Sequence, residues 1–366
     1  MSRWAWAEVD LDAVTHNIEL LRAVATPAQL WAVVKADGYG HGMVPIARAA
    51  LAGGAAGLCV ALVQEGVGLR TAGLDCPILV LSEQPPSELS EAVRLGLDLT
   101  VYSHEQLEAI AAVGARDHPV HLKIDTGMRR VGAAAEDALD LATAISESTA
   151  VRLAGIFTHL AVADEPVDPF NAAQIEAFGD VLTALAVAGH RAPLVHAANS
   201  AATIAIPMAR FDMVRVGIAM YGISPGPALN QMAAALRPAL SLRARVSHIK
   251  RVRAGDRISY GLTHRFDRET TVATLPIGYA DGVPRRLRAE VLIGGRRRSI
   301  VGVVTMDQLM VDCGDDHVAL GDEAVLIGPQ GDQQITAVEW ADRLGVIGYE
   351  VVCGISARVE RRYISA

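Results

Sequence analysis

The feature that most constrains the fold of this chain is a regular alternation of short apolar runs with amphipathic stretches between residues 10 and 220. The short runs are rich in β-branched and aliphatic residues, as buried strands are, and the stretches between them have helical spacing. Eight candidate strands follow one another, namely Trp31–Lys35, Leu58–Ala61, Ile78–Leu81, Leu99–Tyr102, Val120–Ile124, Leu153–Thr158, Leu194–Ala197 and Met213–Val216. This α/β pattern predicts a closed (β/α)8 barrel of the TIM type, with an open doubly wound sheet as the alternative.

Signals for the ends of helices support the same alternation. A helix is predicted over Asp12–Val24, before the first strand. Ser103, three residues before Gln106, is typical of a capping box at the start of a helix. Asp168-Pro169 predicts another helix start and Gly189 its end, because proline suits the first turn and glycine the position after the last.

The pattern changes after about Leu229, where strand-like runs separated by Gly and Asp turns predict a second, mainly β domain. The expected strands are Arg243–Val252, Thr271–Pro276, Glu290–Ile293, Ser299–Val304, Leu309–Cys313 and Glu323–Ile327, with one helix over Thr336–Leu344. Gly294-Gly295 predicts a tight hairpin turn. We therefore expect two domains, residues 10–228 and 229–366, with a boundary near Ser224–Pro227 and with residues 1–9 as a candidate strand for the second domain.

Hydrophobicity narrows the class of protein. Hydrophobic residues make up 51% of the 366 residues but aromatic residues only 4%, so aliphatic side chains must fill the core. The longest uncharged apolar stretch, Ala49–Val63, is too short to span a bilayer. The first residues lack the apolar segment of a signal peptide, so we expect a cytoplasmic protein with no membrane partner.

Charge and cysteine content exclude further classes. The net charge of −8 argues against nucleic acid as a partner. The clusters Arg285–Arg288 and Arg296–Arg298 contain no aromatic residues and are interpreted as solvated loop faces or subunit contacts. The four cysteines are far apart and form no C-x-x-C pair, which argues against a metal site and against disulfides.

Unusual polar residues stand at the carboxyl ends of the predicted barrel strands, where barrel enzymes carry their active sites. They are Lys35 at the first strand, Lys123 at the fifth, His159 after the sixth, Asn199 and Ser200 after the seventh, and Arg215 and Gly217 at the eighth. Burial at a strand end lowers the pKa of a lysine amine toward nucleophilic values, as Schiff-base chemistry requires. Lys35 alone is explained equally well as a lysine that reaches solvent beside a glycine turn, so its interpretation depends on the other residues.

The same positions favour one cofactor. Ser200 and the amides near Gly217 and Ile218 occupy the loops in which barrels commonly bind a phosphate. A phosphate site together with an imine-forming lysine predicts pyridoxal 5′-phosphate (PLP). Arg215 is placed to donate to the pyridine nitrogen, but it cannot give up its proton, so the cofactor would be a weak electron sink. This favours proton exchange at Cα of an amino acid over transamination, decarboxylation or aldol chemistry.

The second domain contributes further candidates, which are Tyr260, Tyr279, Met306, Asp307 and Tyr349. Each of them, taken singly, is explained more simply as a structural or turn residue. His159, taken singly, is likewise explained more simply as a structural histidine.

Together, the motifs resemble the alanine racemase family over the whole length of the chain. The most specific block is Val33–Gly42, and the others, in the family's order, are Lys123–Gly132, His196–Ala201, Arg215–Gly222, Ile277–Gly282 and Met306–Gln308. The resemblance implies a PLP-bearing barrel, a β domain and a head-to-tail homodimer with active sites shared between subunits. It also implies that L- and D-alanine are interconverted to supply D-alanine for peptidoglycan.

The resemblance also implies residue roles. Lys35 would hold PLP and act as the base toward D-alanine, and Tyr260 of the partner subunit would be the base toward L-alanine, its pKa of about 10 lowered by nearby positive charge. Cofactor contacts are implied for Tyr39, His159, Asn199, Ser200, Arg215, Gly217, Ile218 and Tyr349. Substrate contacts are implied for Arg130, Met306 and Asp307, an access corridor for Tyr279 and Asp164, and a carbamylated lysine that orients Arg130 for Lys123.

The chain departs from the family pattern at two places. Asp37-Gly38 stands where Asn-Ala is commoner, and Val303 stands where an arginine of the access corridor is usual. The second departure keeps open a broad-specificity or serine-preferring racemase. A PLP carrier or regulatory protein without catalysis is a further alternative, which Tyr260 disfavours because a carrier needs no second base.

Overall fold

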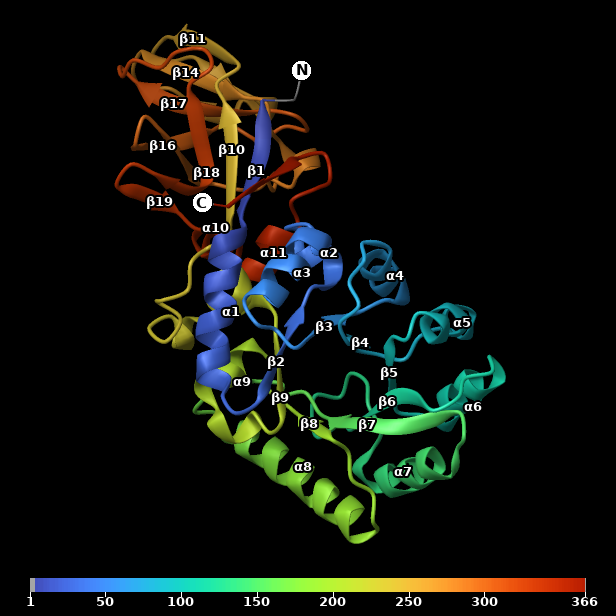
Figure 1. Ribbon diagram of the computed structural model, residues 1–366. Helices are drawn as coiled ribbons and strands as arrows, with labels where there is room; N and C mark the ends of the chain where they lie inside the picture. The colour runs from blue at the N-terminus through green and yellow to red at the C-terminus, as the bar shows by residue number, and fades with distance from the viewer. Residues whose placement is uncertain (1–3, 366) are drawn as a thin grey trace. The chain divides into compact units, whose positions relative to one another are not determined.

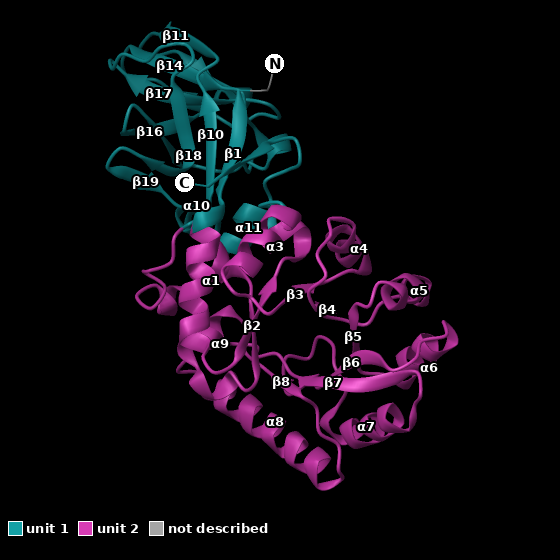
Figure 2. Cartoon of the chain, viewed as in Figure 1, with its two compact units in different colours: residues 1–12, 39–42, 238–366 teal, residues 13–38, 43–237 magenta. Residues whose placement is uncertain are grey.

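The computed structural model describes residues 4–365 (Figure 1). They divide into two compact units (Figure 2). One, which we call the barrel unit, comprises Ala13–Gly38 and Met43–Arg237. The other, which we call the β unit, comprises the described residues up to Asp12, Tyr39–Gly42 and the described residues from Pro238 onward. Across residues 4–365, no helix combines the length and the apolar character needed to cross a bilayer.

Eight parallel strands close into a barrel, which confirms the predicted fold class. They are β2 (Gln29–Val33), β3 (Gly57–Val60), β4 (Ile78–Val80), β5 (Asp98–Val101), β6 (His118–Lys123), β7 (Val151–Phe157), β8 (Leu194–His196) and β9 (Met213–Val216). Every strand pairs with its neighbours in sequence, and β2 closes the barrel by pairing with β9. All three residues of β4 are fully buried, as expected for a strand that is covered on both faces.

Helices alternate with these strands as predicted. They are α1 (Leu11–Ala25), α2 (Lys35–Tyr39), α3 (Met43–Ala52), α4 (Val63–Thr71), α5 (Pro86–Arg94), α6 (His104–Ala112), α7 (Ala138–Glu147), α8 (Pro169–Val187) and α9 (Ser200–Ala205). Ser103 Oγ accepts a hydrogen bond from the Gln106 amide at 3.2 Å and so caps α6. Asp168 Oδ1 accepts from the Phe170 amide at 2.8 Å and caps α8 in the same way.

The β unit is built on a ten-stranded sheet with the order β11-β14-β17-β16-β15-β18-β10-β1-β20, and β19 pairs with β18. Its strands are β1 (Ala5–Asp10), β10 (Leu240–Arg245), β11 (His248–Val252), β14 (Thr270–Leu275), β15 (Glu290–Ile293), β16 (Arg296–Val301), β17 (Leu309–Gly314), β18 (Glu323–Gln330), β19 (Gln333–Ile335) and β20 (Glu360–Ile364). The short strands β12 (Arg257–Ile258) and β13 (His264–Arg265) form a separate pair, and the helices are α10 (Ala337–Leu344) and α11 (Gly348–Cys353). The candidate strand near the N-terminus is β1, which pairs with β10 and β20.

Two strand predictions were wrong. Arg243–Val252 is two strands rather than one, because the chain changes neighbours between them. The Val246 amide donates to Asp322 O and the next amide, of Ser247, donates to Thr274 O, so consecutive residues bond to different strands. The first barrel strand ends at Val33, so Lys35 lies beyond its end, in the turn.

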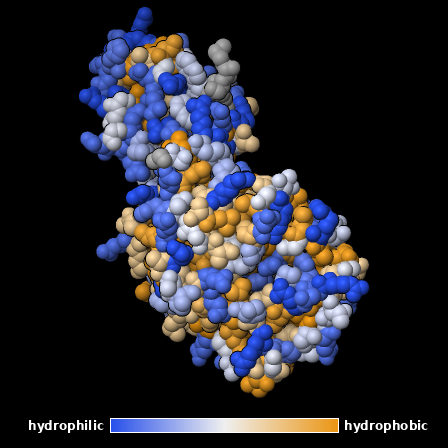
Figure 3. All heavy atoms as spheres, viewed as in Figure 1, coloured by the Kyte–Doolittle hydropathy of each residue, from blue (hydrophilic) through white to orange (hydrophobic). Residues whose placement is uncertain are grey.

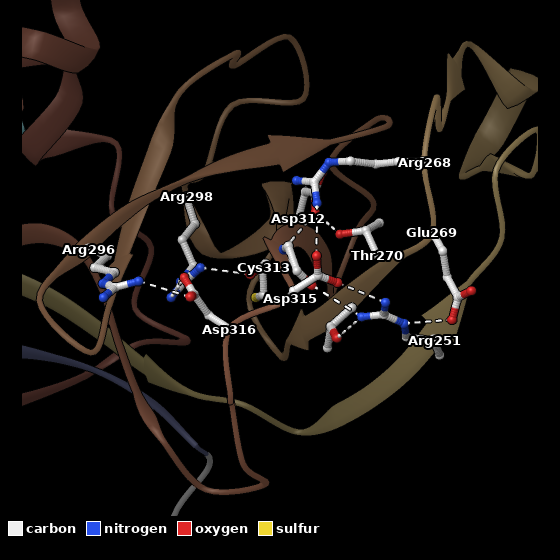
Figure 4. A network of polar contacts seen from close by, with 12 residues as sticks. Arg251, Arg268, Glu269, Thr270, Arg296, Arg298, Asp312, Cys313, Asp315 and Asp316 are labelled. Carbon is white, nitrogen blue, oxygen red and sulfur yellow. Dashed lines mark hydrogen bonds and ion pairs between the residues drawn. The ribbon is translucent and has the colours of Figure 1, made fainter.

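The cluster Arg296–Arg298 lies on β16 and not in a solvated loop. The guanidinium of Arg298 is buried, donates to Cys313 O at 2.8 Å and pairs with Asp316 at 2.8 Å (Figure 4). Arg296 pairs with the same carboxylate at 2.8 Å. These arginines therefore tie the sheet to the turn after β17. Hydrophilic side chains cover most of the face of the β unit seen in Figure 3, whereas the barrel unit mixes both kinds there.

Candidate active site

The turn after β2 carries Lys35 at the carboxyl end of the barrel strands. Ala36 and Asp37 have left-handed backbone angles, with φ of 53° and 52°. Each such residue costs about 1–2 kcal/mol, so other contacts must hold the turn. Glu65 Oε1 accepts from the Ala36 amide at 2.6 Å, and Asp37 Oδ1 accepts from the Met43 amide at 2.9 Å. Strain that is maintained in this way is typical of a functional site.

Lys123, the last residue of β6, carries a buried amine. Its Nζ lies 3.4 Å from Leu81 O and 5.3 Å from the centre of the Phe157 ring. Burial, followed by the charges of Arg215 and Arg130, lowers the pKa of this amine from 10.5 to about 8. Roughly a tenth of this amine is therefore uncharged and nucleophilic at pH 7, far more than for an ordinary lysine.

A small pocket beside this amine is lined by side chains that follow β6 and β7. They include Lys123, Asp125, Met128, Arg130, Thr158 and His159. The pKa of His159 lies well below its usual value because the ring is buried and because four cations act on it, which are Arg215, Arg130, Lys123 and Lys35. Positive charge therefore converges on a neutral imidazole, an arrangement that suits an anionic ligand.

Arg215 lies on β9 with its guanidinium buried in the barrel. The guanidinium donates to Thr158 O at 2.9 Å and to Ala197 O at 3.0 Å, and it contacts His159 Nδ1 at 3.3 Å and His196 Nδ1 at 2.5 Å. Burial lowers the pKa of Arg215 to about 10, so the group stays charged at neutral pH. Three of these four acceptors share the two N–H groups of Nη2, and the fourth faces Nη1, which has a second N–H that can serve a ligand.

The loops after β8 and β9 meet at Ser200. Its Oγ accepts from the Gly217 amide at 2.9 Å and from the Ala219 amide at 3.4 Å. Ile218 lies buried between these two amides in the chain. Asn199 uses its Oδ1 to accept from the Ala202 amide at 3.0 Å and so caps α9. A hydroxyl group and backbone amides directed to one point are the groups from which phosphate sites are built.

In the β unit, residues 39–42 pack against α11 and β20. The rings of Tyr39 and Tyr349 lie 6.1 Å apart between centroids. Arg361 Nε donates to Gly40 O at 3.0 Å. A Cβ on Gly40 would lie 2.5 Å from Val352 O, so only glycine permits this approach. The structure thereby places the two predicted tyrosine ligands side by side.

Tyr260 lies between β12 and β13, and 70% of its surface is exposed. Ser259, with φ of 66°, holds the turn by donating from Oγ to Val303 O at 2.8 Å. The Tyr260 side chain borders a groove of the β unit whose walls include Thr305 and Gln308. A large aromatic side chain is thus presented outward beside a concave surface.

Met306 and Asp307 lie in the loop that contributes to this groove, and 52% of Met306 is exposed. Arg358 donates to Asp307 Oδ1 at 2.6 Å. The amide of the exposed Tyr279 donates to Thr305 O at 2.9 Å, which connects it to the same loop. Asp164 lies in the barrel unit, exposed in the loop after β7.

Sequence reasoning did not single out four polar side chains behind the site, which are Asp98, His121, Gln174 and His196. Gln174 is fully buried on α8, where its Oε1 accepts from the Ala161 amide at 2.8 Å. Its Nε2 donates to Thr126 Oγ1 and to His159 O, both at 3.2 Å, so it joins the loops after β6 and β7. The sequence signal that could have identified these four residues is a polar side chain on a strand or helix face that is otherwise apolar.

Comparison with known proteins extends over the whole chain. Residues 9–225 match the family described as "Alanine racemase, N-terminal domain", and residues 239–363 match "Alanine racemase, C-terminal domain". The alanine racemase of Thermobifida fusca is 48% identical to this chain over 375 residues, and the match covers 100% of both chains. The alanine racemase of Symbiobacterium thermophilum is 48% identical over 367 residues, and the match covers 99% of this chain and 97% of that one. Two solved structures each match with a TM-score of 0.94 and 40% identity over 100% of this chain. One is alanine racemase from Streptomyces lavendulae, of which the match covers 98%, and the other is alanine racemase from Bacillus anthracis with bound L-Ala-P, of which it covers 96%.

Proposed function

The chain belongs to the alanine racemase family and interconverts L- and D-alanine, and we propose that it does so with PLP bound at the carboxyl end of the barrel. The observation that carries this proposal is the buried guanidinium of Arg215, which lies 3.3 Å from His159 Nδ1 beside a pocket that Arg130 also lines. An anionic phosphate and a substrate carboxylate are the ligands that such a site accommodates. The product would supply D-alanine for peptidoglycan in the cytoplasm.

The residues present fit PLP. Lys35 supplies a primary amine for its aldehyde, and Arg215 supplies a charged N–H donor for its ring nitrogen. Phosphate ligands would come from Ser200 with the amides of Gly217 and Ile218, while Asn199 holds that loop. Tyr39 and Tyr349 would add two hydroxyl donors. When bound, PLP withdraws electrons from the amino acid joined to it and so acidifies the Cα proton.

Two bases on opposite faces of Cα would carry the proton transfers. Lys35 would take the proton from D-alanine, while the phenol of the partner subunit's Tyr260 would deliver one to the other face. In the reverse direction, the phenolate would take the proton from L-alanine and Lys35 would deliver one. Arg215 keeps its own proton, so it would hydrogen-bond the ring nitrogen without protonating it. The bound cofactor would then be a weaker electron sink, which disfavours the side reactions that strong electron withdrawal by the ring allows.

We propose that the active unit is a homodimer in which each β unit completes the partner's site. The support is the exposure of Tyr260 and Met306 beside one groove. Large apolar side chains grouped on a surface are typical of protein contacts. The partner's Met306 amide would bind the substrate carboxylate together with Arg130, and the partner's Asp307 would shape the site.

Lys123 is the proposed carbamylated residue. Its uncharged amine would attack CO2, so that an N–C bond forms, a proton leaves the nitrogen and a carbamate anion results. The lowered pKa of about 8 supports this reaction because it provides uncharged amine near neutral pH. The carbamate would pair with the nearby guanidinium of Arg130 and orient it toward the substrate carboxylate.

The residue at position 303 bears on the substrate range. Val303 is buried where the family usually has an arginine, so the corridor with Tyr279 and Asp164 would lack one charge. This observation supports serine as a second candidate substrate. An amino-acid panel with chiral analysis tests it, and turnover of alanine alone would exclude the broad-specificity alternative.

The chain has only three lysines, at positions 35, 123 and 250, so covalent attachment can be mapped without ambiguity. We expect PLP-loaded protein treated with borohydride to carry the cofactor on the Lys35 peptide and to lose the conversion of L-alanine to D-alanine. Lys250 lies exposed on β11, so Lys250→Ala should still carry the trapped cofactor on the Lys35 peptide. A label on Lys123, or turnover retained by Lys35→Ala, would overturn the assignment.

A further inference from the structure

A row of polar side chains, all buried except a partly exposed Asp98, runs from Arg215 through the barrel, and we call it the histidine string. Its members are Arg215 on β9, His196 on β8, His121 on β6 and Asp98 on β5. Arg215 Nη1 lies 2.5 Å from His196 Nδ1, and His196 Nε2 lies 2.9 Å from His121 Nδ1. His121 Nε2 lies 3.5 Å from Asp98 Oδ2. Both imidazole rings are fully buried.

The chemistry of arginine sets the position of every proton in the string. A guanidinium only donates, so His196 Nδ1 must accept and carries no proton. His196 is neutral, because burial and the charge of Arg215 keep its pKa well below the usual range, and its single proton is therefore on Nε2. That proton is donated to His121 Nδ1, which leaves the proton of His121 on Nε2. This nitrogen lies 3.5 Å from Asp98 Oδ2, in an ion contact and not a hydrogen bond.

The fold makes room for the string. The pairing of β6 with β7 shifts register between Val120 and His121, and His121 then faces Gly155. A Cβ on Gly155 would lie 2.1 Å from His121 Nδ1, so any larger residue would displace the ring. Phe157 stacks on His196 with centroids 4.6 Å apart and planes 8° apart. Apolar side chains of the same shape would serve stability as well as these imidazoles do, so stability alone does not account for the string.

We propose that His196, His121 and Asp98 are positioning residues that set the orientation and the donor strength of Arg215 toward the cofactor's ring nitrogen. This rests on the proposed function, in which Arg215 faces that nitrogen. The carboxylate at the far end polarises the two imidazoles in series, and each becomes a better acceptor for the group before it. With His196 on one side and the carbonyls of Thr158 and Ala197 on the other, the guanidinium cannot turn.

The proton positions can be measured without turnover. In PLP-loaded protein labelled with 15N in histidine, His196 and His121 should each show one protonated nitrogen, Nε2, at pH 7. Their signals are assigned from His196→Asn and His121→Asn, each of which lacks one of them. A proton on Nδ1 of either ring, or on both nitrogens of His196, would overturn the string.

Three variants separate the parts of the string. His121→Leu removes the nitrogen that accepts from His196 Nε2. His121→Asn keeps an oxygen that can accept there but does not reach the Asp98 carboxylate. Asp98→Asn removes only the negative charge of that carboxylate. We expect kcat to fall roughly 10-fold in His121→Leu and less in the other two, because one hydrogen bond in a charged network is lost. KM for alanine should not change, and the absorption maximum of bound PLP should shift.

His118→Asn is the matched control, because His118 lies on the same strand, is buried and donates from Nε2 to Leu97 O at 2.8 Å, outside the string. It should lower the melting temperature without changing kcat or the absorption maximum. An unchanged kcat and spectrum in His121→Leu, or equal changes in His118→Asn, would overturn the proposal. Failure of the Lys35 trapping would instead overturn the PLP assignment and leave the tautomers as stated.

Discussion

Arg215 donates to Nδ1 of His159 across 3.3 Å and so joins β9 to the loop after β7. The arginine lowers the pKa of the imidazole and needs it unprotonated as an acceptor. The hydrogen bond and the positive charge of Arg215 therefore both favour the neutral form of His159.

Protonation of buried histidines should destabilise the protein below neutral pH. The pKa values of His118, His159 and His196 all lie below their usual range, chiefly because of burial. The unfolded chain therefore binds more protons than the folded chain once the pH falls below about 6.5. The free energy of unfolding should decrease from about pH 6.5 to about pH 5, by up to about 1.4 kcal/mol per pH unit for each histidine. Urea unfolding at a series of pH values measures this slope.

His159→Asn should reduce the slope of the unfolding free energy against pH, because the variant lacks one of the histidines that bind a proton more readily in the unfolded chain. Identical slopes in wild type and His159→Asn would contradict the assignment of a neutral, buried His159.

Tyr260→Phe should affect the two enantiomers unequally. Loss of the phenol removes the proposed base toward L-alanine, and general acid–base catalysis of this kind contributes about 100- to 10,000-fold. Exchange of the α-proton in deuterated water should therefore fall much more for L-alanine than for D-alanine. Tyr102→Phe, on the barrel unit, should exchange both enantiomers like wild type. An equal loss for both enantiomers in Tyr260→Phe would rule out the two-base assignment.

Carbamylation of Lys123 should depend on pH. Its pKa is lowered to about 8, so the reactive uncharged amine increases as the pH rises from about 6.5 to 8.5. With 13C-labelled CO2 at constant dissolved concentration, a carbamate resonance should grow over this range. The resonance should be absent in Lys123→Ala and present in Lys35→Ala. Persistence of the signal in Lys123→Ala would place the modification elsewhere.

Gly155→Ala should destabilise the barrel. The added methyl group would lie 2.1 Å from the His121 ring, and overpacking of this kind costs about 1–3 kcal/mol. Gly179, within α8, has no neighbour that a Cβ would meet, so Gly179→Ala should stabilise the protein by about 0.5–1 kcal/mol. Thermal and urea unfolding measure both effects. A Gly155→Ala protein as stable as wild type would mean that the His121 ring is free to move.

Local patterns were sufficient for the architecture. The cap at Ser103 and the turn at Gly294-Gly295 each depend on a few neighbouring residues, and both are present, the turn joining Ile293 to its partner Arg296. Because the barrel strands are parallel and pair in chain order, residues at their carboxyl ends necessarily gather at one end of the barrel. Lys123 and Arg215 could be placed together on that basis.

Contacts between distant segments could not be predicted in this way. The break between β10 and β11 depends on which strands lie alongside, and the burial of Arg298 depends on Asp316 in another turn. His121 meets His196 only because β6 shifts register against β7 at Gly155. The sequence by itself determined the order of the barrel's strands and helices and which polar residues lie near the strand ends, since backbone preferences act over a few positions. Only the tertiary structure decided which atoms meet, since register and burial depend on the combined packing of segments far apart in the chain.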